Sequence, residues 1–172
     1  MGIIARQGVS NSFAIFIGFF LGGLNTVFIF PHVFQNNLED LGLIQLLVTV
    51  SFIIGQLLTF GSVGITIRYY PKMLSEKRVG QLMYYIWILP TAALTLFGLI
   101  LLLAQENFLS LFIDERISIS SASALIMLFF LTAGITFFRI VSGYSSVLKK
   151  TFLPSFLNEV VVRLLILVFT YL

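Results

Sequence analysis

The sequence has no cysteine and little charge: it contains ten Lys or Arg and seven Asp or Glu among 172 residues. Without cysteine there is neither a disulfide framework nor thiol chemistry, and with a single histidine a structural zinc site is excluded. Charged residues make up 10% of the chain, whereas a soluble domain averages about 25%. Because hydrophobic residues account for 59%, a soluble fold would have too little polar surface to cover itself. The composition therefore indicates a membrane protein.

Four long runs contain no Asp, Glu, Lys or Arg, namely Gln7–Leu38, Leu41–Ile67, Val79–Gln105 and Ile117–Phe138. Each is longer than the roughly 18 apolar residues that a membrane-spanning helix needs. In lipid, such a segment must satisfy its own backbone hydrogen bonds and so forms a helix. Barrel strands alternate apolar and polar residues, and these runs do not. We therefore predict an all-α, polytopic transmembrane helix bundle.

We expect four complete spans and a truncated fifth. They cover about 12–33, 41–67, 79–104, 117–138 and 158–172. The fourth span either ends near Phe138 or continues to Val147. The uncharged stretch that closes the chain is too short to cross a hydrocarbon core about 30 Å thick. We therefore expect residues 1–172 to be the N-terminal lobe of a longer protein.

The charges between the spans alternate in sign along the chain. Seven cations fall on one predicted side of the membrane: Arg6, Arg68, Lys72, Lys77, Arg78, Lys149 and Lys150. Only Arg116 falls in a loop on the other side. Cytoplasmic loops are rich in Lys and Arg, so this asymmetry predicts a cytoplasmic N-terminus. It also explains the basic pI of about 9.4 without a nucleic-acid partner.

One segment, Phe34–Met73, carries a more specific pattern. It contains the loop sequence LEDLGLI from Leu38 to Ile44. The next span then ends in a group of spaced residues: Gly61, Gly64, Arg68, Tyr69 and Pro71. The segment resembles the start of the Wzx-type polysaccharide flippases of the multidrug/oligosaccharidyl-lipid/polysaccharide exporter superfamily. The motif covers about 40 residues, and the order of spans agrees along the rest of the chain.

The resemblance implies one six-helix lobe of a MATE-like fold in a protein of 12–14 spans. Its function would be to flip a polyprenyl-pyrophosphate-linked oligosaccharide across the bacterial inner membrane by alternating access, for O-antigen, capsule or exopolysaccharide synthesis. It implies no cofactor and no catalytic residue. The implied partners are the lipid-linked oligosaccharide, membrane lipids, a polysaccharide polymerase and glycosyltransferases.

Three arginines are candidates for a cationic path along which the anionic headgroup would move: Arg68, Arg139 and Arg163. An anionic headgroup cannot cross hydrocarbon without compensating charge. Each arginine also has a structural interpretation. Arg68 and Arg139 can extend to the membrane surface, and Arg163 can pair with Glu159, which lies four residues earlier on the same helical face.

Several further residues carry predictions. His32 is either an interfacial residue or a proton-coupling group. Gly18 and Gly22 form a GxxxG pattern, which favours close helix packing. The polar residues Asn25, Gln56 and Asn158 can join helices or line a cavity.

Other functions also fit parts of the sequence. A drug/cation antiporter of the same superfamily would favour acidic residues within the spans, and the sequence indicates none there. An intramembrane glycan enzyme would need large outer loops with catalytic residues, and the predicted outer loops are short. A non-transporting membrane protein is the remaining alternative.

Overall fold

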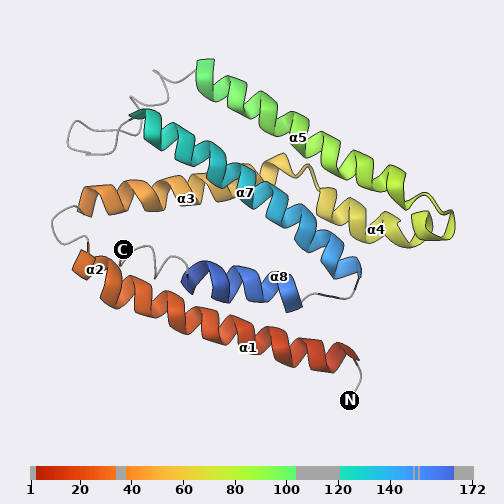
Figure 1. Cartoon of the computed structure of the whole chain (residues 1–172), viewed down its shortest axis with the longest axis horizontal. Coiled ribbons are helices and arrows are strands. Elements are labelled where there is room, and N and C mark those ends of the chain that lie inside the picture. Colours follow the sequence, from red (N-terminus) through yellow and green to blue (C-terminus); the bar gives the residue numbers. More distant parts are fainter. Residues whose placement is uncertain (1–2, 34–37, 104–120, 149, 151, 165–172) are drawn as a thin grey trace. The chain divides into compact units, whose positions relative to one another are not determined.

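The computed structural model describes residues 3–33, 38–103, 121–148, 150 and 152–164. These residues are helical apart from short turns, and the chain divides into two units (Figure 1). The first unit combines 1–38 with 148–172, and the second unit is 39–147. Four helices are long and apolar enough to cross a membrane: Gly8–His32, Leu41–Ser75, Val79–Leu103 and Ala122–Val147. The chain is an all-α, polytopic membrane protein, which confirms the predicted fold class.

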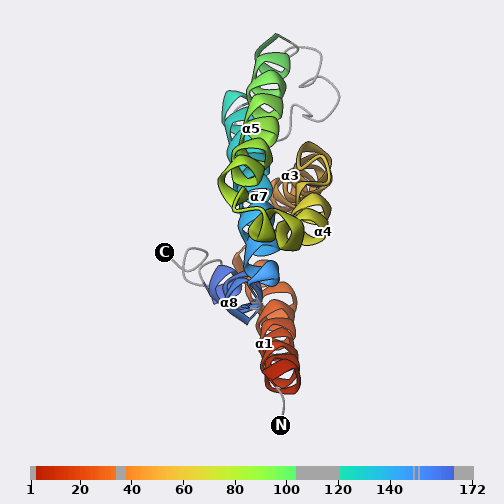
Figure 2. The same cartoon turned by 90° about the vertical axis from the view of Figure 1, so that its right-hand side faces the viewer.

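The first unit packs the two ends of the chain together. Its N-terminal part is a continuous helix made of α1 (Ile3–Leu24), the π-helical turn η1 (Asn25–Ile29) and α2 (Phe30–Val33). Its C-terminal part is α8 (Phe152–Phe156) followed by a second π-helical turn, η2 (Leu157–Val161). Both α8 and η2 lie against α1, and the two helices run in the same direction (Figures 1 and 2).

Pro31 lies two residues after the end of the first π-helical turn. In η1 the N–H of Phe30 donates to the carbonyl of Asn25, five residues earlier. Pro31 then has no N–H to donate, and its ring displaces the carbonyl four residues before it. A π-helical turn is a common accommodation of such a defect within a helix. The helix therefore continues past Pro31 to Val33.

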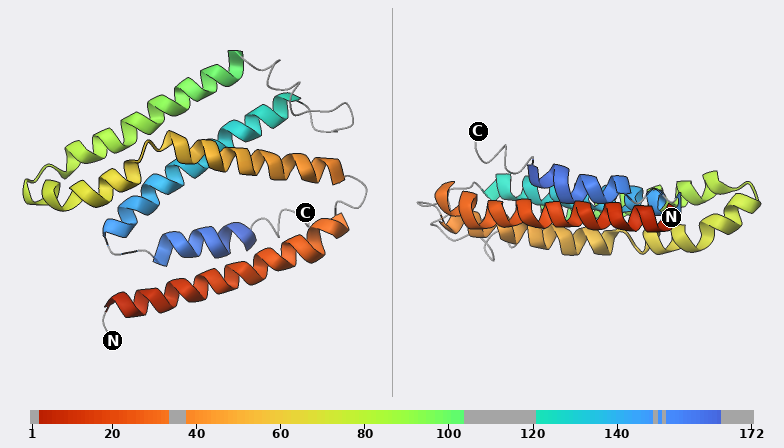
Figure 3. Two further views of the ribbon diagram at one scale, coloured as in Figure 1. Left: turned by 180° about the vertical axis from the view of Figure 1, so that it is seen from behind. Right: turned by 90° about the horizontal axis from the view of Figure 1, so that it is seen from below.

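The second unit contains α3 (Leu38–Leu58), α4 (Ser62–Ser75), α5 (Val79–Leu103) and α7 (Ser121–Val147). In this unit α4 lies against both α5 and α7, and α5 also contacts α7 (Figure 3). One apolar cluster joins α3, α5 and α7 through Leu43, Leu47, Leu101, Ala124 and Leu128. A second joins α5 and α7 through Leu82, Ile86 and Ile140.

Buried hydroxyls complete the packing of α3 against α7. Thr136 Oγ1 donates to the Thr132 carbonyl at 2.7 Å and lies 3.4 Å from the Gly55 carbonyl on α3. Ser51 Oγ on α3 donates to the Leu128 carbonyl at 3.4 Å. Gly55 is needed here, because a Cβ at that position would lie 2.9 Å from Ile135 Cγ2.

The second predicted span is broken rather than continuous. Phe60 and Gly61 have φ values of 45° and 69°, in the left-handed region, and separate α3 from α4. A non-glycine residue rarely adopts this region, and glycine adopts it readily. The run 41–67 carries no charge at this break, so the charge pattern predicted one continuous span.

The other helix boundaries agree with the predicted spans in part. The third helix, Val79–Leu103, agrees with the predicted span. The fourth continues to Val147, which is the longer of the two alternatives. The first helix begins at Ile3, nine residues before the expected start. The fifth begins at Phe152 instead of Asn158, so Glu159 belongs to a helix and not to a loop. Residues 117–120 and 165–172 of the predicted spans lie outside the described residues.

Candidate functional site

Arg163 is the centre of a polar cluster inside the first unit. Its Nη2 lies 2.9 Å from Oε2 of Glu159, one helical turn earlier. Its Nη1 donates to the backbone carbonyl of Gly18 on α1. The side chains of Arg163 and Glu159 keep 32% and 24% of their accessible surface. Glu159 therefore compensates the cation locally, and a face of each side chain stays accessible to a bound molecule.

A stripe of small residues on α1 makes room for this cluster. A Cβ at Gly18 would lie 2.6 Å from the backbone oxygen of Glu159, which cannot move without the whole helix. A Cβ at Gly22 would overlap the guanidinium of Arg163. Gly18 and Gly22 thus face the C-terminal helix directly, and the guanidinium occupies the space that a side chain at Gly22 would fill.

Asn25 joins the two helices at the next turn of α1. Its Nδ2 donates to the Arg163 carbonyl at 3.1 Å, which fixes the orientation of the amide because only the NH₂ group can donate. The side chain is 4% exposed, and Oδ1 has no hydrogen-bond partner among the described residues. A buried acceptor without a partner typically costs about 1–3 kcal/mol. Asn25 therefore brings a buried, unpaired acceptor to the cluster.

The cluster combines donors and acceptors of both signs. Asn158 Nδ2 donates to Glu159 Oε1 at 3.1 Å, so both carboxylate oxygens of Glu159 are engaged. An anion can compete with Glu159 for Arg163, and a cation can compete with Arg163 for Glu159. Within the described ranges, no group of three or more His, Asp or Glu residues is placed to share a metal ion.

The two π-helical turns coincide with the polar residues. Asn25 begins η1, and Glu159 lies inside η2. Such turns interrupt the regular ladder of backbone hydrogen bonds and occur often at functional sites. They make this the most irregular part of the first unit.

Arg139 lies in the second unit, on the long helix α7. It is half-buried, and its guanidinium carbon is 4.9 Å from the centroid of the Phe52 ring on α3. The negative face of an aromatic ring attracts a cation. Among the residues that the structure describes, Arg139 forms no ion pair, so the face of the Phe52 ring is the group that stabilises its charge.

The other predicted residues are more exposed. Arg68 lies on α4, exposed, with its guanidinium carbon 5.9 Å from the ring centroid of Tyr69. His32 is exposed on α2. The structure thus brings together Arg163, Gly18 and Gly22 in the first unit, whereas Arg68 and Arg139 belong to the second. The headgroup path through all three arginines stays a prediction.

The spacing of four residues between Glu159 and Arg163 predicted their pairing as the structural alternative to substrate binding, and the structure shows that pair. The contribution of Gly18 could not be read from the sequence, since it depends on which helix packs against α1.

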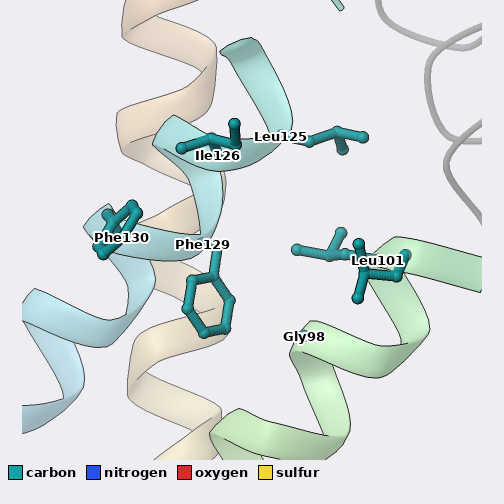
Figure 4. Close-up of a pocket in the computed structure, with 7 residues that line it drawn as sticks. Gly98, Leu101, Leu125, Ile126, Phe129 and Phe130 are labelled. Atoms are coloured by element: carbon teal, nitrogen blue, oxygen red, sulfur yellow. The ribbon is translucent and has the colours of Figure 1, made fainter. Parts of the chain in front are cut away.

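The second unit also contains an apolar pocket of about 210 Å³ between α5 and α7 (Figure 4). It is lined by Gly98, Leu101, Leu102, Leu125, Ile126, Phe129 and Phe130. Gly98 leaves space for the Phe129 ring, because a Cβ at Gly98 would lie 2.9 Å from that ring. Because the lining has no polar group, the pocket cannot hold a hydrated headgroup. The Arg163 cluster is therefore the better candidate site.

No protein-family model, curated protein or solved structure matches this chain. The function is accordingly inferred from the sequence and the geometry of the site.

Proposed function

We propose that this chain is part of the N-terminal lobe of a transporter that flips a polyprenyl-pyrophosphate-linked oligosaccharide. The membrane would be the bacterial inner membrane, with the N-terminus in the cytoplasm. The flippase-like motif between Leu38 and Pro71 suggests the substrate class. The four apolar helices support the membrane setting.

The observation that carries the proposal is the Arg163–Glu159 pair on the glycine stripe of α1. The sequence predicts that the helix of Arg163 enters the membrane, and an ionisable residue within a transmembrane segment is a functional candidate by default. A pyrophosphate has the charge and the acceptor oxygens to replace the Glu159 carboxylate on the guanidinium. The free acceptor of Asn25 would then take a donor from the entering headgroup, such as a sugar hydroxyl. The exchange leaves Arg163 compensated at every stage, which keeps the barrier low.

A drug/cation antiporter of the same superfamily is the second candidate, and one structural observation favours it. Glu159 lies in a helical segment that packs against α1, so an acidic residue stands at a contact between helices. A cationic substrate would engage Glu159 and displace Arg163. The two functions therefore share a site and differ in which member of the pair binds the substrate.

Substitutions at Arg139, Arg163 and Glu159 separate the candidates. In the full-length protein, Arg163→Ala and Arg139→Ala should each abolish export of surface polysaccharide while the amount of protein in the membrane is unchanged. Arg163→Lys should retain partial export because it keeps the charge but loses the bidentate geometry. Lys150→Ala, an exposed cation outside the cluster, is the matched control.

Full export by both alanine variants would contradict the flippase. Glu159→Gln should leave polysaccharide export measurable under this proposal. If Glu159→Gln instead abolishes resistance to cationic drugs and export is unaffected by any substitution, the antiporter is the correct function.

A further inference from the structure

The turn between α4 and α5 holds a lysine in an unusual backbone conformation. Lys77 has a φ of 57°, in the left-handed region. The Arg78 N–H donates to the Met73 carbonyl at 2.9 Å, and the Lys77 N–H donates to the Leu74 carbonyl at 3.2 Å. These two bonds define a Schellman motif, in which Lys77 occupies the position that glycine usually takes.

A lysine at this position has an energetic cost. For an L-residue, the left-handed conformation brings Cβ close to the following carbonyl oxygen, and glycine avoids this contact. Residues held in such conformations cluster at functional sites. The turn itself would form more readily with glycine, so the lysine side chain points to a role beyond closing the turn.

The turn is strongly basic, and none of its charges is paired with another residue that the structure describes. Lys72, Lys77 and Arg78 are exposed, and the nearby anion Glu76 forms no ion pair with them in the described part of the chain. Lys72 is explained by its place in the last turn of α4, where a cation interacts favourably with the helix dipole. Lys77 and Arg78 lie beyond that helix, so the dipole does not account for both of them.

Aromatic residues indicate the depth of this turn in the membrane. Tyr84, Tyr85 and Trp87 on α5 are 63%, 69% and 42% exposed. Exposed Tyr and Trp concentrate at the boundary between hydrocarbon and headgroups. Tyr85 follows Arg78 by seven residues, or roughly 10 Å of helix. The cations of the turn therefore lie at the level of the lipid phosphates.

We propose that Lys72 at the end of α4, together with Lys77 and Arg78 in the α4–α5 turn, forms a binding site for the phosphate groups of anionic phospholipids in the surrounding leaflet. Three exposed cations close together in the chain are complementary to these headgroups. The left-handed backbone at Lys77 fixes the direction in which its side chain leaves the turn. Basic segments next to a transmembrane helix bind anionic lipids in this way. The site goes beyond the proposed transport function, since it takes a bulk lipid and not the transported one.

Lipid retention by the purified full-length protein tests the site. The protein is mixed with equal amounts of phosphatidylglycerol and phosphatidylcholine, and bound lipids are counted by native mass spectrometry. The wild type should retain phosphatidylglycerol preferentially. The double variant Lys77→Gly/Arg78→Gln should lose about fivefold in affinity for each charge removed. Lys77→Arg should retain the preference.

Two controls make the result decisive. Lys77→Gly places glycine at its preferred position, so the thermal midpoint should not fall and weaker binding cannot be attributed to misfolding. Lys150→Gln removes an exposed cation outside the turn and should leave the preference unchanged. Equal retention of both lipids by the wild type, unchanged retention by the double variant, or an equal loss in Lys150→Gln would each overturn the proposal. Retention of only a polyprenyl-pyrophosphate lipid, with no competition by phosphatidylglycerol, would overturn it as well.

Discussion

The two units join their helices through different polar groups. In the first, a charged guanidinium and an amide connect the helices, through Arg163 to the Gly18 carbonyl and Asn25 to the Arg163 carbonyl. In the second, hydroxyls such as Thr136 bond within their own helix at 2.7 Å and reach the neighbouring helix only at 3.4 Å. Among its described residues, the second unit has one such charged contact, Arg139 over the Phe52 ring, and otherwise joins its helices by apolar packing and these hydroxyls. The first unit instead places an ion pair and a buried amide at the contact between its helices, where each group is costly to leave unpaired.

The largest expected effect comes from adding a side chain at Gly18, where α1 lies closest to the C-terminal helix. Gly18→Leu should lower the free energy of unfolding by about 3 kcal/mol or more, because the new side chain meets the Glu159 backbone and not a movable side chain. Thermal unfolding of the purified full-length protein measures this. Gly23→Leu is the control, since a Cβ there meets nothing within 4 Å. Equal stability of the two variants would show that α1 does not depend on this contact.

A smaller effect is expected from removing one charge of the pair. Glu159→Gln should cost about 2 kcal/mol, because Arg163 loses its counter-charge. The value is below the 3–5 kcal/mol typical of a fully buried pair, since both side chains are partly exposed. The double variant Glu159→Gln/Arg163→Met should recover most of this loss. A double variant less stable than Glu159→Gln alone would contradict the assignment of the pair as the source of the effect.

The smallest effect is expected in the second unit. Thr136→Val keeps the shape of the side chain and removes its hydroxyl, so it should cost about 0.6 kcal/mol, the average for such bonds between membrane helices. Thr91→Val serves as the control, because its hydroxyl is exposed and bonds only to its own helix. A loss at Thr136 as large as that of Glu159→Gln would remove the contrast between the units.

Hydrophobic runs predicted most of the fold, because lipid leaves a long apolar segment no alternative to a helix. The span Val79–Leu103 and the all-α class follow directly from this constraint. The break at Phe60 and Gly61 does not, since an uncharged run looks the same whether its helix is straight or interrupted. The π-helical turns at Asn25 and Glu159 likewise depend on packing that no local pattern records.

The candidate site was predictable in its members but not in its arrangement. Arg163 stood out as a cation in an apolar stretch, and its spacing from Glu159 offered the pairing that the structure shows. The partner of the glycine stripe is a tertiary fact, because Gly18 and Arg163 are separated by 145 positions. The buried acceptor of Asn25 could be recognised only when every neighbouring donor was located.

The distance along the chain between Gly18 and Arg163 has a consequence for biosynthesis. A ribosome adds roughly 5–20 residues per second, so the 145 residues between the two partners take roughly 7 to 30 seconds to make. During that interval the first helix is already synthesised while its partner does not yet exist, and the Asn25 amide cannot form its hydrogen bond to the Arg163 carbonyl. In the second unit the corresponding interval is a little over half as long, because Gly55 and Thr136 are 81 positions apart. Asn25 on the first helix therefore stays without its Arg163 partner until synthesis reaches residue 163, and an insertion factor or a lipid would shield it in that interval.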